Sequence, residues 1–436
     1  PGRLASTASM SRARTLIFAG CAVLVAAFVV FLVTGAREKP EPRLPAPSPS
    51  PSPSPSPEPT PPPAGRGLAV GVTEFNANLI AAPSARPLPA PWDGVREALG
   101  AIAPRFYRLV VDWSAIQPMA GQPPDLGVFH DGCNRAAPPC LPWAGIRDQL
   151  RALASRQRAG GWDALVVITW TPEWAAARAH GCERDDTPAR ARPPRAGALT
   201  AYRRLVGALV EAAAQEGATL RYWSAWNEPN HPAFLSPQRE RCDASARSAA
   251  PASYAEIVRA LQQALADAPG DQQLVLGETA GLLKRTPLVT SVPEFIAGLP
   301  KDVVCASTVW TQHAYIGGPD PAPAAARALD ARDCPRRHTL WITETGVGPA
   351  PKGLSAANAV GDPQDGCRAL HRRLVRWWRN KRVTAAFQYT VREDPAFATG
   401  LVSGDLEHRR PALAEWQAWG GDRNPAAPPP PSTCDE

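Results

Sequence analysis

Two glutamates lie in short motifs whose neighbours suit acid–base and nucleophilic chemistry. Glu228 lies within Trp226-Asn-Glu-Pro-Asn230, and Glu344 lies within Leu340-Trp-Ile-Thr-Glu-Thr-Gly346. Each follows an apolar run of the kind that forms a buried strand. Two carboxyl groups can divide proton transfer and nucleophilic attack between them if one is held protonated and the other ionised. Glu228 and Glu344 are therefore the candidate catalytic residues.

The elements that must position these glutamates alternate along the chain. Short apolar, β-branched runs predict strands at 68–74, 106–111, 164–169, 220–226, 273–278, 303–313, 339–344 and 384–391. Longer runs with helical spacing lie between them and predict helices at 92–102, 143–156, 199–215, 254–267, 292–297, 322–330, 366–380 and 411–419. Such alternation predicts a parallel sheet that is covered by helices.

Eight strand–helix units favour a closed (β/α)8 TIM barrel over residues 67–420. A doubly wound open sheet is the alternative, but it calls for a Gly-rich first turn, and Thr73-Glu-Phe-Asn76 contains no glycine. In a barrel the active site lies at the carboxyl ends of the strands. Glu228 and Glu344 follow the fourth and seventh predicted strands, so their side chains can meet across the mouth.

These two motifs resemble those of clan A glycoside hydrolases, in which the fourth strand closes with Asn-Glu-Pro and the seventh carries a second glutamate. The resemblance implies a retaining enzyme that cleaves β-glycosidic bonds by double displacement. Glu228 would be the acid/base, Glu344 the nucleophile, and Asn227 the partner of the sugar 2-hydroxyl. The structural alternative is that both glutamates cap helices or lie exposed in loops. Retaining hydrolysis also requires carboxyl groups only about 5–5.5 Å apart.

Further stretches match the clan, most closely its families 39 and 5. Arg108 in Arg108-Leu-Val-Val-Asp-Trp113 would lie below the nucleophile. In Gln312-His-Ala-Tyr315, His313 would lie near the sugar and Tyr315 would hydrogen-bond to the nucleophile. Core packing or a loop position remains the alternative for each of these residues.

Two departures from the clan concern the sugar-binding aromatic residues. The third strand ends in Thr169-Trp-Thr-Pro-Glu-Trp174 without the expected histidine, and the eighth offers Tyr389 where a stacking tryptophan is expected. Trp170 and Trp174, together with Trp113 and Trp310, are the candidate stacking residues for a sugar. Each of these tryptophans could equally be a core residue.

The amino-terminal region predicts a membrane anchor and a spacer. Residues 15–36 form 22 uncharged, mostly apolar positions between Arg14 and Arg37, enough to cross a hydrocarbon core of about 30 Å. Arg3, Arg12 and Arg14 favour a cytoplasmic segment 1–14 and a single-pass protein whose remainder is extracytoplasmic. Secretion after cleavage of a signal peptide is the alternative. Residues 37–66 predict a Pro/Ser-rich disordered linker, and residues 421–436 a Pro-rich tail.

Cysteines and charge agree with an exported domain. Eight of the nine cysteines lie beyond the apolar segment, and an even number suggests disulfides. Position alone suggests pairing of 133 with 140, 182 with 242, and 305 with 334, with reduced thiols as the alternative. The net charge is +7, but residues 67–436 hold 40 basic and 37 acidic residues. That balance does not indicate a nucleic-acid partner.

The leading hypothesis is therefore a glycosidase that acts on oligo- or polysaccharides at or outside the cell surface. No metal or nucleotide cofactor is predicted, since the sequence has no His/Cys cluster, Walker motif or Gly-rich dinucleotide turn. The alternatives are a catalytically inactive barrel that binds surface glycans, and an anchored scaffold for envelope proteins. The sequence leaves the sugar, the linkage and the oligomeric state open.

Overall fold

The computed structural model describes residues 67–135, 137–348, 361–395, 397–421 and 427–435. The predicted cytoplasmic segment 1–14, membrane helix 15–36 and linker 37–66 lie outside these residues, and the tail 421–436 is described only in part. Within the described ranges, no helix has both the length and the apolar character needed to span a membrane.

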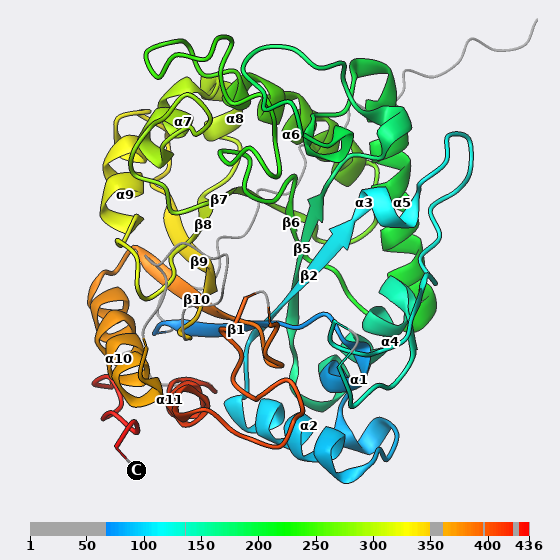
Figure 1. Cartoon of the computed structure of the whole chain (residues 1–436), viewed down its shortest axis with the longest axis vertical. Helices are drawn as coiled ribbons and strands as arrows, with labels where there is room; N and C mark the ends of the chain where they lie inside the picture. The colour runs from blue at the N-terminus through cyan, green and yellow to red at the C-terminus, as the bar shows by residue number, and fades with distance from the viewer. Residues whose placement is uncertain (1–66, 136, 349–360, 396, 422–426, 436) are drawn as a thin grey trace, which may run out of the picture. The chain divides into compact units, whose positions relative to one another are not determined.

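The described chain forms a closed barrel of eight parallel strands, which confirms the predicted barrel and excludes the open sheet (Figure 1). Neighbouring strands follow the order β1-β10-β9-β8-β7-β6-β5-β2 around the barrel. The barrel strands are β1 (Ala69–Thr73), β2 (Phe106–Asp112), β5 (Asp163–Thr169), β6 (Tyr222–Ser224), β7 (Gln273–Thr279), β8 (Val309–His313), β9 (Thr339–Thr345) and β10 (Val383–Tyr389).

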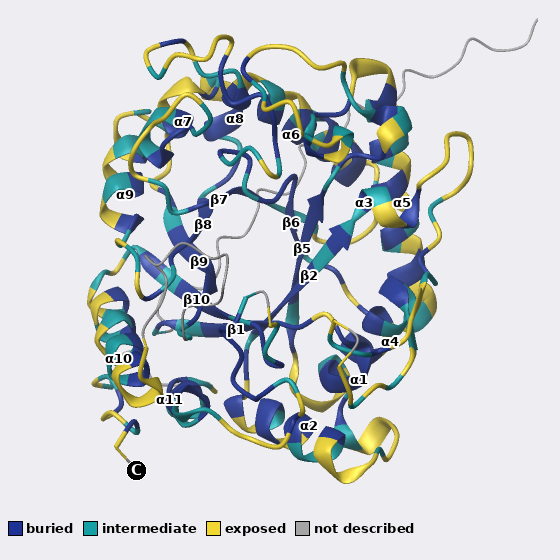
Figure 2. Cartoon of the chain, viewed as in Figure 1, coloured by how far each residue is buried: buried dark blue, intermediate teal, exposed yellow. Residues whose placement is uncertain are grey.

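Helices surround the strands, with buried faces toward the barrel and exposed faces outward (Figure 2). They are α1 (Ala77–Ile80), α2 (Ala90–Ile102), α3 (Trp113–Ile116), α4 (Gly145–Gly160), α5 (Leu199–Glu216), α6 (Ala250–Ala266), α7 (Val292–Gly298), α8 (Lys301–Val304), α9 (Ala322–Asp330), α10 (Pro363–Arg379) and α11 (Pro411–Trp419). An inserted ribbon between β2 and β5 pairs β3 (Phe129–His130) with β4 (Trp143–Ala144) in antiparallel fashion.

Large aromatic side chains fill the barrel interior and form the floor of the mouth. Phe106 packs against Trp341 and Phe387, with ring centroids 4.7 and 5.6 Å apart. Gly71 lies level with both phenylalanines in the strand register. A Cβ atom at Gly71 would lie 2.3 Å from the Phe387 ring, so this position needs glycine for the interior to close. Because successive residues face opposite sides of a strand, Arg108 points into the barrel directly above Phe106.

Most predicted elements differ from the structure by a few residues at their ends, and three of these differences have a clear local reason. The predicted strand 303–313 is a strand only from Val309, because Val303 and Val304 belong to the short helix α8 that follows Pro300. The predicted helix 143–156 begins at Gly145, since its first two residues pair in the β3–β4 ribbon. The predicted strand 220–226 ends at Ser224, where the backbone leaves the ladder toward Glu228.

Disulfides join loops and helices around the barrel. The described residues hold four of them, Cys133–Cys140, Cys182–Cys242, Cys305–Cys334 and Cys367–Cys434. The first three confirm the suggested pairings, and the fourth attaches the carboxyl-terminal tail to α10. Such a set of disulfides is typical of extracellular proteins.

Candidate active site

The described mouth of the barrel gathers five charged side chains from five strand ends. Arg108 lies on β2, Glu278 on β7, His313 on β8 and Glu344 on β9, whereas Glu228 follows β6. Four of them are at most 7% exposed, and the Glu228 side chain is 16% exposed. Groups that are distant in the sequence therefore share one site at the carboxyl ends of the strands, as expected for this fold.

The backbone at the strand ends turns through the left-handed region to present these side chains. Trp170, Glu228 and Glu278 have φ angles of 54°, 40° and 51°. Such a conformation costs a non-glycine residue on the order of 1–3 kcal/mol and persists where the surroundings enforce it. The Glu228 amide donates to the carbonyl of Glu278 at 2.8 Å, which ties the β6 and β7 ends together.

Arg108 forms the centre of the floor. Its Nε and Nη2 atoms donate to Oε2 of Glu278 at 2.9 and 2.6 Å. Nη2 also donates to the side-chain oxygen of Asn227 at 2.7 Å, and Nη1 lies 2.8 Å from Oε1 of Glu344. One guanidinium thus orients two carboxylates and the amide that precedes Glu228, using the planar donor geometry of arginine.

Glu344 is held from two sides. Arg108 contacts its Oε1 atom, and the hydroxyl of Tyr315 donates to Oε2 at 2.6 Å. The ion pair and the hydrogen bond together fix the orientation of the Glu344 carboxyl group. Burial raises the pKa of Tyr315 well above its usual value, and the charge of Glu344 raises it further. The tyrosine therefore stays protonated as a donor.

His313 bridges the remaining carboxylates. Its Nδ1 atom lies 2.7 Å from Oε1 of Glu228 and 3.3 Å from Oε2 of Glu344, and its Nε2 atom lies 3.3 Å from Oε2 of Glu278. Burial alone would lower the pKa of His313, but Glu344, Glu228 and Glu278 together raise it to about 10. The imidazole is therefore a cation at neutral pH.

The positive charges of Arg108 and His313 lower the pKa values of two neighbouring carboxyl groups. Burial acts to raise the pKa of Glu278, but Arg108 and His313 outweigh it and bring the pKa to about 2. Burial likewise acts to raise the pKa of Glu228, and the hydrogen bond and charge of His313 lower it overall. His313 and Glu228 therefore behave as a coupled pair that shares one proton.

Glu228 and Glu344 face each other closely. One carboxylate oxygen of each lies within 4.8 Å of the other, with a His313 nitrogen inside the same distance. Two carboxyl groups that lie this close to one histidine can both reach a single group bound in the mouth of the barrel.

The same three side chains lie close enough together to hold a metal ion. Their protonation argues against that use, because a histidine must be neutral to ligate a metal and His313 is cationic among three carboxylates. Arg108 also occupies Oε1 of Glu344. The donor set therefore suits proton transfer rather than metal binding.

The predicted aromatic residues separate into different groups. Trp170 is half-buried, stacks on Phe234 at 5.5 Å between ring centroids, and carries the Arg190 guanidinium over its ring at 4.7 Å. Tyr389 packs edge-on against Tyr315 at 6.4 Å, beside Glu344. Both rings therefore border the catalytic cluster or the loops that lead to it.

The other candidate tryptophans serve the core. Trp113 and Trp310 are fully buried, so neither can offer a ring face to a sugar. Trp174 packs edge-on against Trp113 at 6.1 Å, and its indole donates to the carbonyl of Gln117 at 2.9 Å. These contacts place Trp174 in the packing of the loop after β5, and they give it no contact with the charged cluster.

Glu278 lies in the site but was not among the site residues predicted from the sequence. It appears only as the end of a predicted strand, without a recognisable motif around it. Its signal in the sequence is weak: a glutamate two residues after the apolar run Leu274-Val-Leu276 cannot be buried in a strand end without a cationic partner. Arg108 is that partner.

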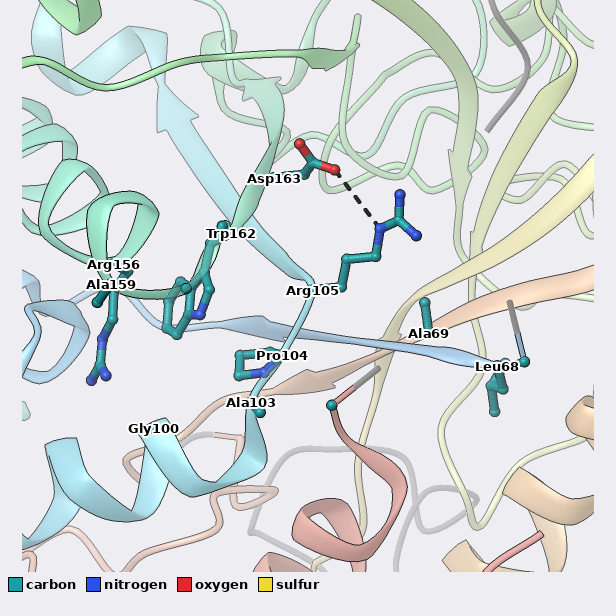
Figure 3. A pocket seen from close by; sticks show the side chains of 14 residues that line it. Leu68, Ala69, Gly100, Ala103, Pro104, Arg105, Arg156, Ala159, Trp162 and Asp163 are labelled. Atoms are coloured by element: carbon teal, nitrogen blue, oxygen red, sulfur yellow. Dashed lines mark ion pairs between the residues drawn. The ribbon is translucent and has the colours of Figure 1, made fainter. Parts of the chain in front are cut away.

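A cavity of about 530 Å³ lies at the amino-terminal end of the barrel, opposite the charged cluster (Figure 3). Arg105 and Asp163 form an ion pair of 3.8 Å in its wall. Arg156 stacks over Trp162 at 5.0 Å and donates to the carbonyl of Ile80. This cavity holds none of the paired carboxylates, and that end of the barrel ordinarily serves stability.

Comparisons with known proteins show similarity in fold but not in sequence. No protein-family model matches the sequence, and no curated protein matches it either. Solved structures do match. A family 39 β-xylosidase from Caulobacter crescentus is 16% identical with a TM-score of 0.50, over 82% of this chain and 72% of that one.

Other solved structures match at slightly lower TM-scores. The family 53 catalytic domain from Ignisphaera aggregans is 13% identical with a TM-score of 0.49, over 81% of this chain and 97% of that one. A family 39 glycoside hydrolase from Bacteroides cellulosilyticus WH2 is 14% identical with a TM-score of 0.47, and 81% of this chain spans 63% of its length. At 16% identity and a TM-score of 0.50, the likeness to the family 39 β-xylosidase shows the fold alone, the eight-stranded parallel barrel that the sequence predicted.

Proposed function

We propose that this protein is a retaining glycosidase that cleaves β-linked oligo- or polysaccharides outside the cell. The observation that supports this most strongly is the facing pair Glu228 and Glu344, with oxygens within 4.8 Å. Each glutamate has its own partners: Arg108 and Tyr315 for Glu344, and His313 for Glu228. Such unequal surroundings give two carboxyl groups different roles.

In the first step, an ionised oxygen of Glu344 attacks the anomeric carbon and forms a glycosyl ester. The bond to the leaving oxygen breaks, and that oxygen takes a proton from Glu228. The proton comes from the Glu228–His313 pair, whose 2.7 Å contact allows transfer between them. Arg108 and Tyr315 orient the attacking carboxylate through an ion pair and a hydrogen bond.

In the second step, water replaces the leaving group. Glu228 accepts a proton from that water, the water oxygen bonds to the anomeric carbon, and Glu344 leaves as a carboxylate. Esterification of Glu344 removes one negative charge from the cluster, which favours the ionised form of Glu228 at this stage. Glu278 stays ionised throughout and balances Arg108 and His313.

The disulfides and the sequence support the proposed extracytoplasmic location. Four disulfides persist in an oxidising compartment. We further propose that residues 15–36 anchor the chain as a single membrane span and that residues 37–66 act as a spacer, because of their composition. The alternative is secretion after cleavage of a signal peptide. Sequencing the amino terminus of the mature protein distinguishes the two, because cleavage would remove residues 15–36.

A substrate screen tests the function. The full chain is assayed against aryl β-glycosides of xylose, glucose, mannose and galactose and against polymeric glycans, beside Glu344→Ala. We expect turnover on at least one sugar, with loss in the variant and a β-anomer as the first product. Binding of glycans by both proteins without any turnover would instead support the alternative of an inactive barrel that binds surface glycans.

A further inference from the structure

A second hollow opens at the same end of the barrel as the catalytic cluster. It has a volume of about 150 Å³, roughly the size of one sugar unit. Its lining comes from the residues after β1, the residues after β10 and the inserted β3–β4 ribbon. These three segments are far apart in the sequence, yet several contacts hold them together.

The hollow is rigidly built. Glu74 accepts backbone hydrogen bonds from Phe75 and Asn76 at 2.9 Å, and from Arg392 at 2.9 Å. Arg392 donates to the carbonyl of Gly132 at 3.3 Å. The ribbon loop is closed by the Cys133–Cys140 disulfide. Such cross-links make a preformed wall, which binding does not have to order.

Aromatic rings connect this hollow to the reactive carboxylate. Phe75 lines it, is 37% exposed, and packs edge-on against Tyr389 at 6.0 Å. Tyr389 contacts Tyr315, whose hydroxyl is bonded to Glu344. A chain of rings therefore runs from the proposed nucleophile to the hollow.

The ribbon adds a further flat surface. His130 and Trp143 are register partners in β3 and β4, and their rings stack at 4.1 Å with an angle of 10°. Both line the hollow. Phe129, the neighbour of His130, is 71% exposed and points to the other face of the ribbon. Aromatic rings beside polar groups suit the C–H faces and hydroxyls of a sugar.

The charges of the hollow suit a neutral ligand. Among its described lining residues, the arginine is Arg392, whose side chain donates to the carbonyls of Gly132, Ala137 and Gly404. Burial lowers the pKa of His130, so the ring is neutral at pH 7. Asp131 and Asp394 also line the hollow. Arg135 pairs with Asp394 at 2.6 Å, whereas Asp131 would repel a carboxylate or sulfate group.

We propose that this hollow is a further subsite, which binds a neutral sugar unit beyond the one that reacts. The inference rests on the proposed glycosidase function and deepens it. The chain would bind neutral β-linked oligosaccharides more tightly than monosaccharide glycosides or uronic-acid chains. The bound unit belongs to the glycone side, because the hollow is linked to Glu344, whereas Trp170 lies beside the acid/base strand end.

Calorimetry on the inactive Glu344→Ala full chain tests the subsite. The probes are β-1,4-linked di- and trisaccharides of xylose, glucose, mannose and galactose, and a trisaccharide that ends in glucuronic acid. One additional sugar should strengthen binding by about tenfold. Adding Trp143→Ala should remove that gain and leave disaccharide binding unchanged, whereas Trp143→Phe should restore most of it.

Two matched variants separate the subsite from a general loss of structure. Phe129→Ala changes the other face of the same ribbon and should leave trisaccharide binding unchanged. Asp131→Asn keeps the acceptor for the Cys133 amide but removes the charge, and should weaken trisaccharide binding about threefold.

Equal trisaccharide affinity in the Trp143→Ala and parent proteins would overturn the subsite, and so would the absence of binding by every neutral probe. Tighter binding of the uronic-acid probe would overturn the charge argument. Because binding is measured on an inactive variant, these outcomes are independent of turnover. Failure of the glycosidase proposal would appear separately, as no hydrolysis of the same probes by the wild type.

Discussion

Arg108 and Glu278 form a fully buried ion pair, with 2.6 Å between the guanidinium Nη2 and the carboxylate Oε2. The same guanidinium contacts Asn227 and Glu344. Because a buried charge without its partner is costly, neither member of the pair can be neutralised without moving the groups that Arg108 orients. Glu278 is thus a positioning residue for the proposed nucleophile.

Glu278→Gln should lower both stability and activity. The neutral amide leaves Arg108 and His313 short of one negative charge, so we expect a loss of about 3 kcal/mol in the free energy of unfolding. Turnover should fall by at least about tenfold, because both Arg108 and His313 lose a partner. Chemical denaturation and aryl glycoside kinetics measure these effects. Glu97→Gln, on an exposed position of α2, should change neither.

Tyr315→Phe tests the hydrogen bond to the nucleophile. The variant removes a 2.6 Å donor to Glu344 that also stabilises the carboxylate when it leaves. We expect kcat to fall on the order of 100-fold, as for the loss of one donor to a developing anion, with a smaller change in KM. Tyr202→Phe is the control, since its hydroxyl donates to Ala225 at 2.8 Å outside the site. Comparable kcat values in both variants would argue against the role of Tyr315.

The pH dependence of stability reports on His313. Its pKa is about 10 in the folded protein and about 6.5 in an unfolded chain. The folded state therefore holds a proton that the unfolded state releases, and the stabilisation is full below pH 6.5 and lost by about pH 10. Between pH 7 and 10 the wild type should lose more unfolding free energy than His313→Gln. Parallel curves for the two proteins would refute a cationic His313.

The loss of unfolding free energy on removing a disulfide should increase with the length of the loop that the disulfide closes. Cys182–Cys242 closes a separation of 60 residues and Cys133–Cys140 one of 7. The chain-entropy model gives about 4 and about 2 kcal/mol for such loops. Paired serine variants, followed by denaturation, should reproduce this order. In the unfolded wild type, thiol titration should find one reactive group per chain, that of Cys21. More than one thiol would contradict the four disulfides.

The sequence predicts most of the fold because its strands are buried on both faces. Apolar β-branched runs such as Ala164–Thr169 are distinct from the helical patterns between them, so the eight barrel strands and their order along the chain could be read directly. The short strands β3 and β4 and the one-turn helices α1, α3 and α8 were not predicted. The errors fall on short segments. Val303 and Val304 have strand-like side chains but follow Pro300 into one turn of helix, where local propensity says little.

The site was predictable where motifs mark it. Asn227, Glu228 and Glu344 lie in recognisable runs, and Arg108, His313 and Tyr315 follow by resemblance. Glu278 lacks a motif, and only the barrel closure brings it to Arg108. The stacking role of tryptophans was unpredictable because it depends on burial, and Trp113 and Trp310 are fully buried. The hollow at the β3–β4 ribbon depends on contacts between three distant segments.

The central claim is that Glu344 attacks the sugar and Glu228 serves as acid/base. The most direct measurement is mass spectrometry of the full chain after reaction with 2-deoxy-2-fluoro-β-glycosyl fluorides of the sugars in the screen. These reagents form the glycosyl ester but slow its hydrolysis. We predict that the protein gains the mass of one fluorosugar and that peptide mapping places it on Glu344. A fluorosugar on any other residue, or hydrolysis with inversion and no adduct, would contradict the account.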